Sequence, residues 1–224
     1  MSAGLGRGGS RRDRREHAWD RYWSEAHRGG HGHPGEFTRW AVPFLRSAGA
    51  RSVVDLGCGA GRDLSFLLEE GFSVTGVDCS AVATELSAKT ISRLGPKVRG
   101  RGCVINDDLL DFLTRLRPDS VDAVHAAATY QGLSDREVSE LFAETHRVLI
   151  RGGLHLWSVR NKDHPGKIHP DLVPPNFPKL GFTVPLRFFS VEDVERFRGD
   201  RFEELALENA PDGHSYRIAD RKPV

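Results

Sequence analysis

Cysteine and methionine are scarce in this sequence. Its 224 residues include 1 methionine and 3 cysteines, which are Cys58, Cys79 and Cys103. An odd number of cysteines, without a CxxC pair or another metal-ligand spacing, argues against a disulfide framework and against a zinc site. We therefore expect a protein of the reducing cytoplasm.

Long hydrophobic runs and an excess of one charge are also absent. No apolar stretch approaches the roughly 18 residues of a membrane-spanning helix, and the arginine-containing N-terminus lacks the apolar segment of a secretion signal. The 32 basic and 31 acidic residues leave a net charge of +1. Such a chain has no bulk attraction to nucleic acid or anionic lipid, so we expect neither a nucleic-acid nor a membrane partner.

The amino-acid composition of the chain changes near residue 17. Residues 1–16 are rich in glycine, arginine and serine, and predict a disordered tail. Aromatic residues then accompany two expected helices over 16–27 and 36–48, which would form an N-terminal lid on a single domain of residues 17–224. The histidines of the glycine-rich loop between these helices lack acidic or cysteine partners, so no metal is expected at His27, His31 or His33.

An alternation of strands and helices follows. Buried strands are expected at 52–56, 72–77, 102–106, 121–125 and 154–159. Ser134 and Glu137 form a capping box before a helix that Gly152 and Gly153 would end. Residues 161–189 hold six prolines and read as a loop, followed by a helix after Ser190 and a hairpin over 202–208 and 215–219. This pattern predicts a doubly wound, mostly parallel sheet with helices on both faces.

The segment between the first strand and its helix carries the most information. It reads Asp55-Leu56-Gly57-Cys58-Gly59-Ala60-Gly61-Arg62. A dinucleotide fingerprint is G-x-G-x-x-G, and its third glycine would fall at Arg62. An acid two residues before the first glycine would repel a pyrophosphate but suits a ligand with an ammonium group.

This motif and its surroundings resemble the class I S-adenosylmethionine (SAM)-dependent methyltransferases over residues 50–160. The resemblance implies SAM as cofactor and a seven-stranded sheet of order 3-2-1-4-5-7-6 with strand 7 antiparallel. Arg147-Val148-Leu149-Ile150-Arg151-Gly152-Gly153 is similar to a further family signature. The cofactor-binding residues that it implies are Asp55, Gly57, Cys58, Gly59, Gly61 and Arg62 in the first motif, Asp78, Cys79 and Ser80 after the second strand, Asp107, Asp108 and Leu109 after the third, and His125 on the fourth.

A motif that the chain lacks argues against one class of methyl acceptor. The [DN]-P-P-[YFW] motif of nucleic-acid amino methyltransferases is missing after the fourth strand, where the chain reads His125-Ala126-Ala127-Ala128-Thr129-Tyr130. Gly61-Arg62-Asp63 and Asp163-His164-Pro165 are similar to the tellurite-resistance and thiopurine methyltransferase group. This resemblance implies methyl transfer to a small molecule at oxygen, sulfur, nitrogen or a metalloid, by a monomer or a homodimer.

The acceptor site is expected between the N-terminal aromatics, the end of the fourth strand and the loop after the fifth. Candidate catalytic residues are His125, Tyr130 and His164, and candidate substrate-binding residues are Trp19, Tyr22, Trp23, Tyr130, Arg160 and His169. Each of these also has a plain structural interpretation, such as anchoring a helix or a solvated loop. Two alternatives stay open, which are an RNA or protein methyltransferase that uses the basic tail and an inactive SAM-binding regulator.

Overall fold

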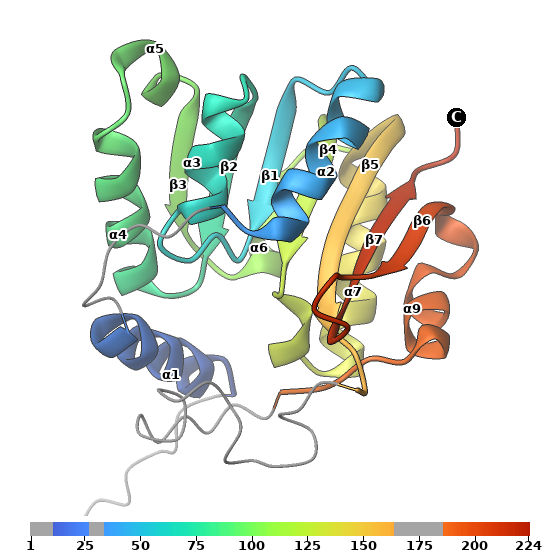
Figure 1. Ribbon diagram of the computed structural model, residues 1–224. Coiled ribbons are helices and arrows are strands. Elements are labelled where there is room, and N and C mark those ends of the chain that lie inside the picture. The colour runs from blue at the N-terminus through green and yellow to red at the C-terminus, as the bar shows by residue number, and fades with distance from the viewer. Residues whose placement is uncertain (1–10, 27–33, 164–185) are drawn as a thin grey trace, which may run out of the picture.

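The computed structural model describes residues 11–26, 34–163 and 186–224 (Figure 1). Its centre is a seven-stranded sheet of order β3-β2-β1-β4-β5-β7-β6. β7 pairs antiparallel with β5 and β6, and the other pairs are parallel. The predicted fold class and strand order are therefore confirmed. The strands are β1 (Ser52–Leu56), β2 (Ser73–Asp78), β3 (Gly102–Asn106), β4 (Val121–Ala127), β5 (Leu149–Arg160), β6 (Glu203–Asn209) and β7 (Ser215–Arg221).

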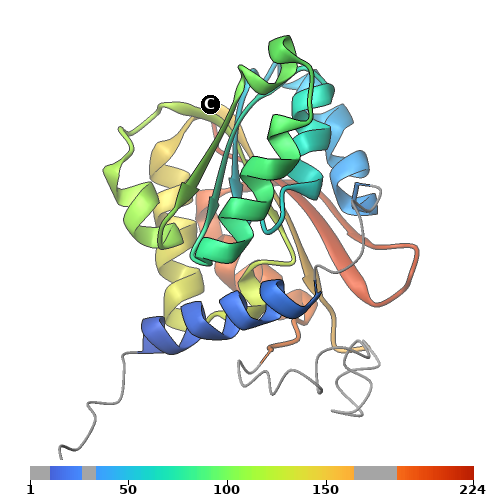
Figure 2. The ribbon, with the colours of Figure 1, turned by 90° about the vertical axis from the view of Figure 1, so that its left-hand side faces the viewer.

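Helices cover both faces of the sheet (Figures 1 and 2). α2, α3 and α4 lie over one face, and α6, α7 and α9 lie over the other. The helices are α1 (Arg11–Ala26), α2 (Glu36–Ser47), α3 (Arg62–Glu69), α4 (Ala81–Ser92), α5 (Pro96–Arg99), α6 (Leu109–Arg115), α7 (Asp135–Val148) and α9 (Val191–Arg198), with short 3-10 turns η1 (Tyr130–Gly132) and η4 (Gly199–Arg201).

Strand alternation divides the core into two clusters. Successive side chains of a strand point to opposite faces, so Val53 packs with Leu64 of α3 while Val54 packs with Phe142 of α7. Both valines are buried. Because both faces of the central strands are covered by helices, the only route for a ligand to these strands is at their ends.

The predicted helix starts are confirmed by their caps. The Ser134 hydroxyl accepts a hydrogen bond from the backbone N–H of Glu137, and the Glu137 carboxylate accepts one from the N–H of Ser134. Ser190 and Asp193 form a second capping box at α9. Each box satisfies backbone donors that a helix end would otherwise leave free.

The strand β5 starts earlier than predicted. Helix α7 ends at Val148, and β5 runs from Leu149 through both glycines to Arg160. Gly152 has a positive φ of 76°, and the pairing of β4 with β5 shifts register nearby. The two glycines therefore form an irregularity within a strand rather than a helix end, and the predicted strand at 154–159 is only the regular part of β5.

Helix α1 also differs from the prediction. It begins at Arg11, so residues 11–16 are helical although the sequence placed them in a disordered tail. Residues 1–10 lie outside the described part of the chain. In both ribbon views α1 crosses the end of the sheet at which β1 and β2 finish (Figures 1 and 2). The helix is thus placed over the strand ends where a ligand would enter.

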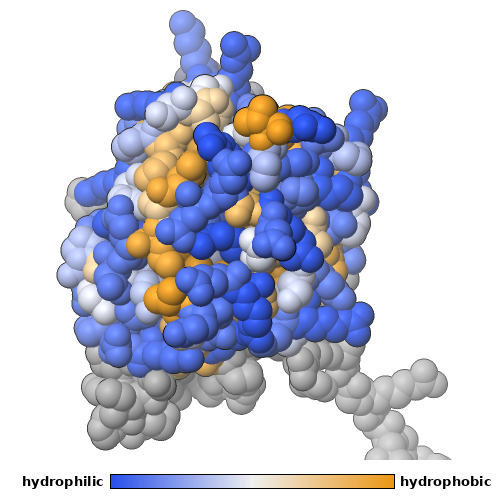
Figure 3. Space-filling model, turned by 90° about the vertical axis from the view of Figure 1, so that its right-hand side faces the viewer, coloured by the Kyte–Doolittle hydropathy of each residue, from blue (hydrophilic) through white to orange (hydrophobic). Residues whose placement is uncertain are grey.

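The side of the molecule at the sheet edge β6 is mostly hydrophilic (Figure 3). Its hydrophobic side chains form a broken strip and smaller separate patches between hydrophilic ones. Glutamates 203, 204 and 208 lie along β6 itself, and charge on an edge strand opposes pairing with another sheet. No helix in the described ranges has the length and apolar character needed to cross a membrane.

Candidate active site

The glycine loop after β1 is hydrogen-bonded to β2 and lies against α1. The backbone N–H groups of Gly57 and Cys58 both donate to the carbonyl oxygen of Val77, at 2.7 and 3.1 Å. Gly59 has a φ of 53°, and a Cβ atom there would lie 2.6 Å from Cζ2 of Trp23. The loop therefore needs glycine at this position for its conformation and for the close approach of the α1 indole.

Among the described residues, one carboxylate oxygen of Asp55 has no hydrogen-bond partner. The residue is 2% exposed, and its Oδ1 atom lies 2.7 Å from Nδ1 of His125. Its Oδ2 atom is the buried oxygen that no described residue contacts by a hydrogen bond, and Asp55 lines the large cavity described below. A buried carboxylate oxygen without a donor is costly, so it is suited to a cationic donor from a ligand.

His125 lies behind Asp55 rather than in the cavity. It is 0% exposed, its Nε2 atom lies 3.2 Å from the hydroxyl of Thr38, and Phe37 stacks on its ring at 5.1 Å. Burial disfavours the imidazolium, but the Asp55 carboxylate outweighs it and raises the pKa of His125 above its usual value. The structure therefore does not place His125 among the residues that line the cavity, because α2 covers it.

Asp78 ends β2 and is tied to the glycine loop. Its two carboxylate oxygens accept hydrogen bonds from the backbone N–H groups of Gly59, at 3.0 Å, and Ser80, at 2.9 Å. Burial raises the pKa of Asp78 to about 6, and the nearby Asp55 and Asp20 act in the same direction. The carboxylate faces the cavity with acceptor capacity to spare.

The third strand end supplies Asp108 and Leu109. Asp108 caps α6 by accepting from the N–H groups of Leu110 and Asp111, and it lines the cavity together with Leu109. The preceding Asp107 instead pairs with Arg115. Of these two successive aspartates, Asp108 is the one that lines the cavity.

Helix α1 is held over the strand ends by polar contacts at two points. Arg15 pairs with Asp108 at 3.2 Å and with Glu137 of α7 at 2.5 Å. Asp20 accepts a hydrogen bond from the hydroxyl of Ser80 at 2.6 Å, at the start of α4. These contacts span the cavity from its α4 side to its α7 side, so α1 forms a roof over it.

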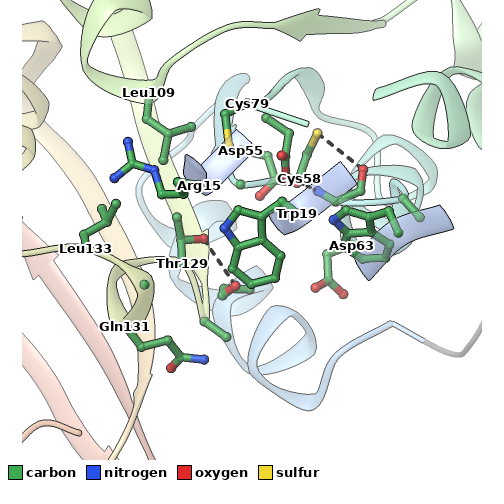
Figure 4. A pocket seen from close by; sticks show the side chains of 18 of the residues that line it. Arg15, Trp19, Asp55, Cys58, Asp63, Cys79, Leu109, Thr129, Gln131 and Leu133 are labelled. Carbon is green, nitrogen blue, oxygen red and sulfur yellow. Dashed lines mark hydrogen bonds between the residues drawn. The ribbon is translucent and has the colours of Figure 1, made fainter. Parts of the chain in front are cut away.

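A cavity of about 810 Å³ lies beneath this roof. Figure 4 shows Trp19 reaching from α1 among side chains of the glycine loop and the strand ends. The predicted site residues that line the cavity are Trp19, Tyr22, Trp23, Asp55, Gly57, Cys58, Gly59, Arg62, Asp78, Cys79, Asp108, Leu109 and Arg160. Gly61, Ser80 and Asp107 adjoin the lining without being part of it.

The two loop cysteines are poor nucleophiles. Burial raises the pKa of Cys58 well above its usual value and that of Cys79 to about 12. A thiol that stays protonated reacts slowly, so both cysteines act as small lining residues.

Tyr130 is a core residue. It is 0% exposed, its hydroxyl lies 2.7 Å from Nε2 of His155, and its ring packs against Phe142 and Trp157. Tyr130 is therefore not among the residues that line the cavity. His164 and His169, together with His27, His31 and His33, lie outside the described residues.

Several cavity residues were missed by the sequence analysis. Thr129 and Gln131 follow β4, and their position just after a strand end was a usable signal. Arg15 was assigned to the tail, and no feature of the sequence marked it. The other missed residues include Asp63, Leu133, Glu137 and Leu141.

The fold and the site agree with one class of protein. A sheet of this order, with a glycine loop after β1 and acids at the ends of β2 and β3, is the arrangement of the methyltransferase α/β fold. Residues 53–153 match the family model described as "Methyltransferase domain". The match includes the glycine loop and the strand ends of β1 to β4.

Known proteins similar to this chain are methyltransferases. Glycine N-methyltransferase of Oryctolagus cuniculus is 51% identical over 45 residues, which are 20% of this chain and 15% of that protein. An uncharacterized methyltransferase of Geobacillus kaustophilus is 30% identical over 101 residues, 45% of this chain and 43% of that protein. The chain thus spans less than half the length of these relatives.

Among solved structures, the 1,6-didemethyltoxoflavin-N1-methyltransferase of Burkholderia thailandensis has a TM-score of 0.70 at 18% identity. The superposition covers 100% of this chain and 94% of that one. At this identity the likeness is one of fold.

Proposed function

We propose that this protein transfers the methyl group of SAM to a small organic molecule. The observation that carries the proposal is the roofed cavity, which the glycine loop and the acids Asp55, Asp78 and Asp108 line together, with one buried oxygen of Asp55 unpartnered among the described residues. An RNA or protein acceptor fits this cavity less well, because α1 covers the strand ends and Arg15 of the basic segment is engaged in internal ion pairs.

The described residues fit the three parts of SAM. Oδ2 of Asp55 would accept a hydrogen bond from the ammonium group of the amino-acid moiety, and the glycine loop would allow close approach of the backbone. The Asp78 carboxylate would accept from the ribose hydroxyls, and Asp108 with Leu109 would flank the adenine. When bound, SAM supplies an electrophilic methyl group on a sulfonium.

The protein's part in the reaction is then to hold the acceptor in line and to exclude water. Trp19, Tyr22 and Trp23 close the cavity from α1. No histidine lines the cavity within the described ranges, and His125 is shielded behind Asp55. These observations favour an acceptor whose nucleophile needs little help from a general base. The narrower similarity to the tellurite-resistance and thiopurine group stays a prediction.

The proposal is tested by binding and turnover together. Calorimetric titration should give a Kd for SAM on the order of the usual 1 µM–1 mM range of enzyme KM values, and NAD should not bind. A panel of small oxygen, sulfur and nitrogen nucleophiles should then yield S-adenosylhomocysteine. NAD binding in place of SAM would refute the cofactor assignment. SAM binding without turnover on any acceptor would favour the inactive regulator.

SAM affinity should fall at acidic pH because of Asp78. Only the carboxylate form can accept hydrogen bonds from both ribose hydroxyls, and its pKa is about 6 in the folded protein. Binding should therefore be level above about pH 7 and weaken as the pH falls through 6. Calorimetry between pH 5 and 8 measures this effect. In Asp78→Asn the affinity at pH 7.5 should drop roughly 10- to 100-fold, for a loss of about 1.5–3 kcal/mol, and the step near pH 6 should vanish. An unchanged step in the variant would assign it to another group.

A further inference from the structure

Three arginines line the cavity, and one of them differs from the other two in its partners. Arg62 pairs with Asp63 at 2.8 Å, and Arg15 pairs with Asp108 and Glu137. Arg160, at the end of β5, also lines the cavity. Within the described ranges its guanidinium forms no ion pair with an acidic group.

The backbone around Arg160 is held firmly. Its N–H donates to Oε1 of Gln131 at 3.2 Å, and its carbonyl accepts from the N–H of Phe189 at 2.9 Å. The same residue pairs with Ser215 across β5 and β7. The guanidinium therefore projects from a fixed point on the sheet, as a specificity residue requires.

Among the described residues, no acidic group compensates the charge of Arg160. Burial lowers the pKa of Arg160, and the partly buried Tyr22 acts against this effect. Of the acids that line the cavity, Asp63 pairs with Arg62, and Asp108 and Glu137 pair with Arg15. A half-buried guanidinium in such a place is stabilised by an anion that enters the cavity.

Its position is on the acceptor side of the cavity. Asp55, Asp78 and Asp108 end or follow β1, β2 and β3, whereas Arg160 ends β5, two strands away from β1 in the sheet. Between them lies β4, followed by Thr129 and Gln131. An anion on Arg160 would thus be separate from the sites assigned to the ammonium, ribose and adenine of SAM.

We propose that Arg160 binds a carboxylate of the acceptor, so that the substrate is a small organic acid. A planar guanidinium matches a carboxylate with two parallel hydrogen bonds. A phosphate dianion would call for more than one cation, and the other two cavity arginines are engaged. This inference rests on the proposed function and names its substrate class.

The transfer itself balances as a simple displacement. A lone pair of the acid's hydroxyl, thiol or amino group forms the bond to the methyl carbon. The electrons of the breaking carbon–sulfur bond return to sulfur, which becomes the neutral thioether of S-adenosylhomocysteine, and the acceptor's proton passes to bulk water. The carboxylate on Arg160 fixes the acceptor without taking part in bond formation.

The test compares acids with their amides on protein saturated with S-adenosylhomocysteine. Aliphatic, hydroxy-, mercapto-, amino- and aromatic carboxylic acids, each beside its primary amide and its phosphonate analogue, are titrated by calorimetry. At least one acid should bind ten or more times more tightly than its amide and its phosphonate. Arg160→Gln should abolish this preference, and Arg160→Lys should restore part of it.

A matched control and the pattern of binding distinguish failure of the proposed function from failure of the carboxylate inference. Arg136→Gln removes an exposed arginine of α7 and should leave all affinities unchanged. If S-adenosylhomocysteine itself does not bind, the proposed function fails. If it binds but no acid exceeds its amide, or if Arg160→Gln keeps the preference while remaining folded, the carboxylate inference alone is overturned. A preference for phosphonates over carboxylates would also overturn it.

Discussion

Replacing Gly59 with valine should abolish SAM binding. The residue has a φ of 53°, where a β-branched side chain is strained, and its Cβ would lie 2.6 and 2.9 Å from two ring atoms of Trp23. Valine would therefore push against the roof of the cavity and displace the backbone N–H that donates to Asp78. We expect no calorimetric heat with SAM at concentrations that saturate the unmodified protein.

The matched control is Gly49→Val. Gly49 has a similar φ of 67°, but nothing lies within 4 Å of its added Cβ. Backbone strain should cost each variant on the order of 1 kcal/mol of stability, and the contact with Trp23 should add to the loss in Gly59→Val, as measured by denaturant unfolding. Only Gly59→Val should lose SAM. Loss of SAM in both variants would mean that strain alone, rather than contact at the loop, explains the result.

The fold could be predicted from the sequence because the local patterns of strands, turns and helix caps agreed with one another. Short apolar runs ended at turn residues, and the caps Ser134 and Ser190 stood where helices begin. Asp55, the glycines and Asp78 follow or end adjacent strands, so their convergence follows from a parallel sheet. None of these inferences required knowledge of side-chain direction.

The direction of its side chain explains why His125 does not line the cavity. Residues of a strand alternate between the two faces, and the ring of His125 turns into the layer of α2, where Phe37 and Thr38 cover it. The cavity begins only at Ala127, beyond the histidine. Tyr130 is absent from the cavity lining for a related reason, because the turn η1 directs its ring into the core beside His155.

The helical segment around Arg15 shows a second limit of prediction from the sequence. Its composition of arginine and glycine predicts disorder when each residue is counted by itself. The helix is stabilised instead by tertiary contacts, since Arg15 meets Asp108 and Glu137, which lie 93 and 122 residues away in the chain. A pattern read along the sequence does not contain such contacts.

Replacing Asp55 with asparagine should raise the Kd for SAM roughly a hundredfold. The variant removes the negative charge that would face the ammonium group, and a charge-assisted hydrogen bond of about 3 kcal/mol corresponds to that factor. The same change removes the group that raises the pKa of His125. Burial then acts with less opposition, so the imidazole resonances should titrate at a lower pH in nuclear magnetic resonance spectra.

The two measurements together distinguish a binding role from a structural one. Asp122→Asn is the matched control, because Asp122 lies at the other end of β4 and accepts from the N–H groups of Arg51 and Ser52. It should alter stability but neither the affinity for SAM nor the titration of His125. If Asp55→Asn lowered the pKa of His125 and left SAM binding intact, Asp55 would serve only to hold the histidine. The ammonium would then be held elsewhere, because the orphaned Oδ2 atom would have no part in recognising the methyl donor.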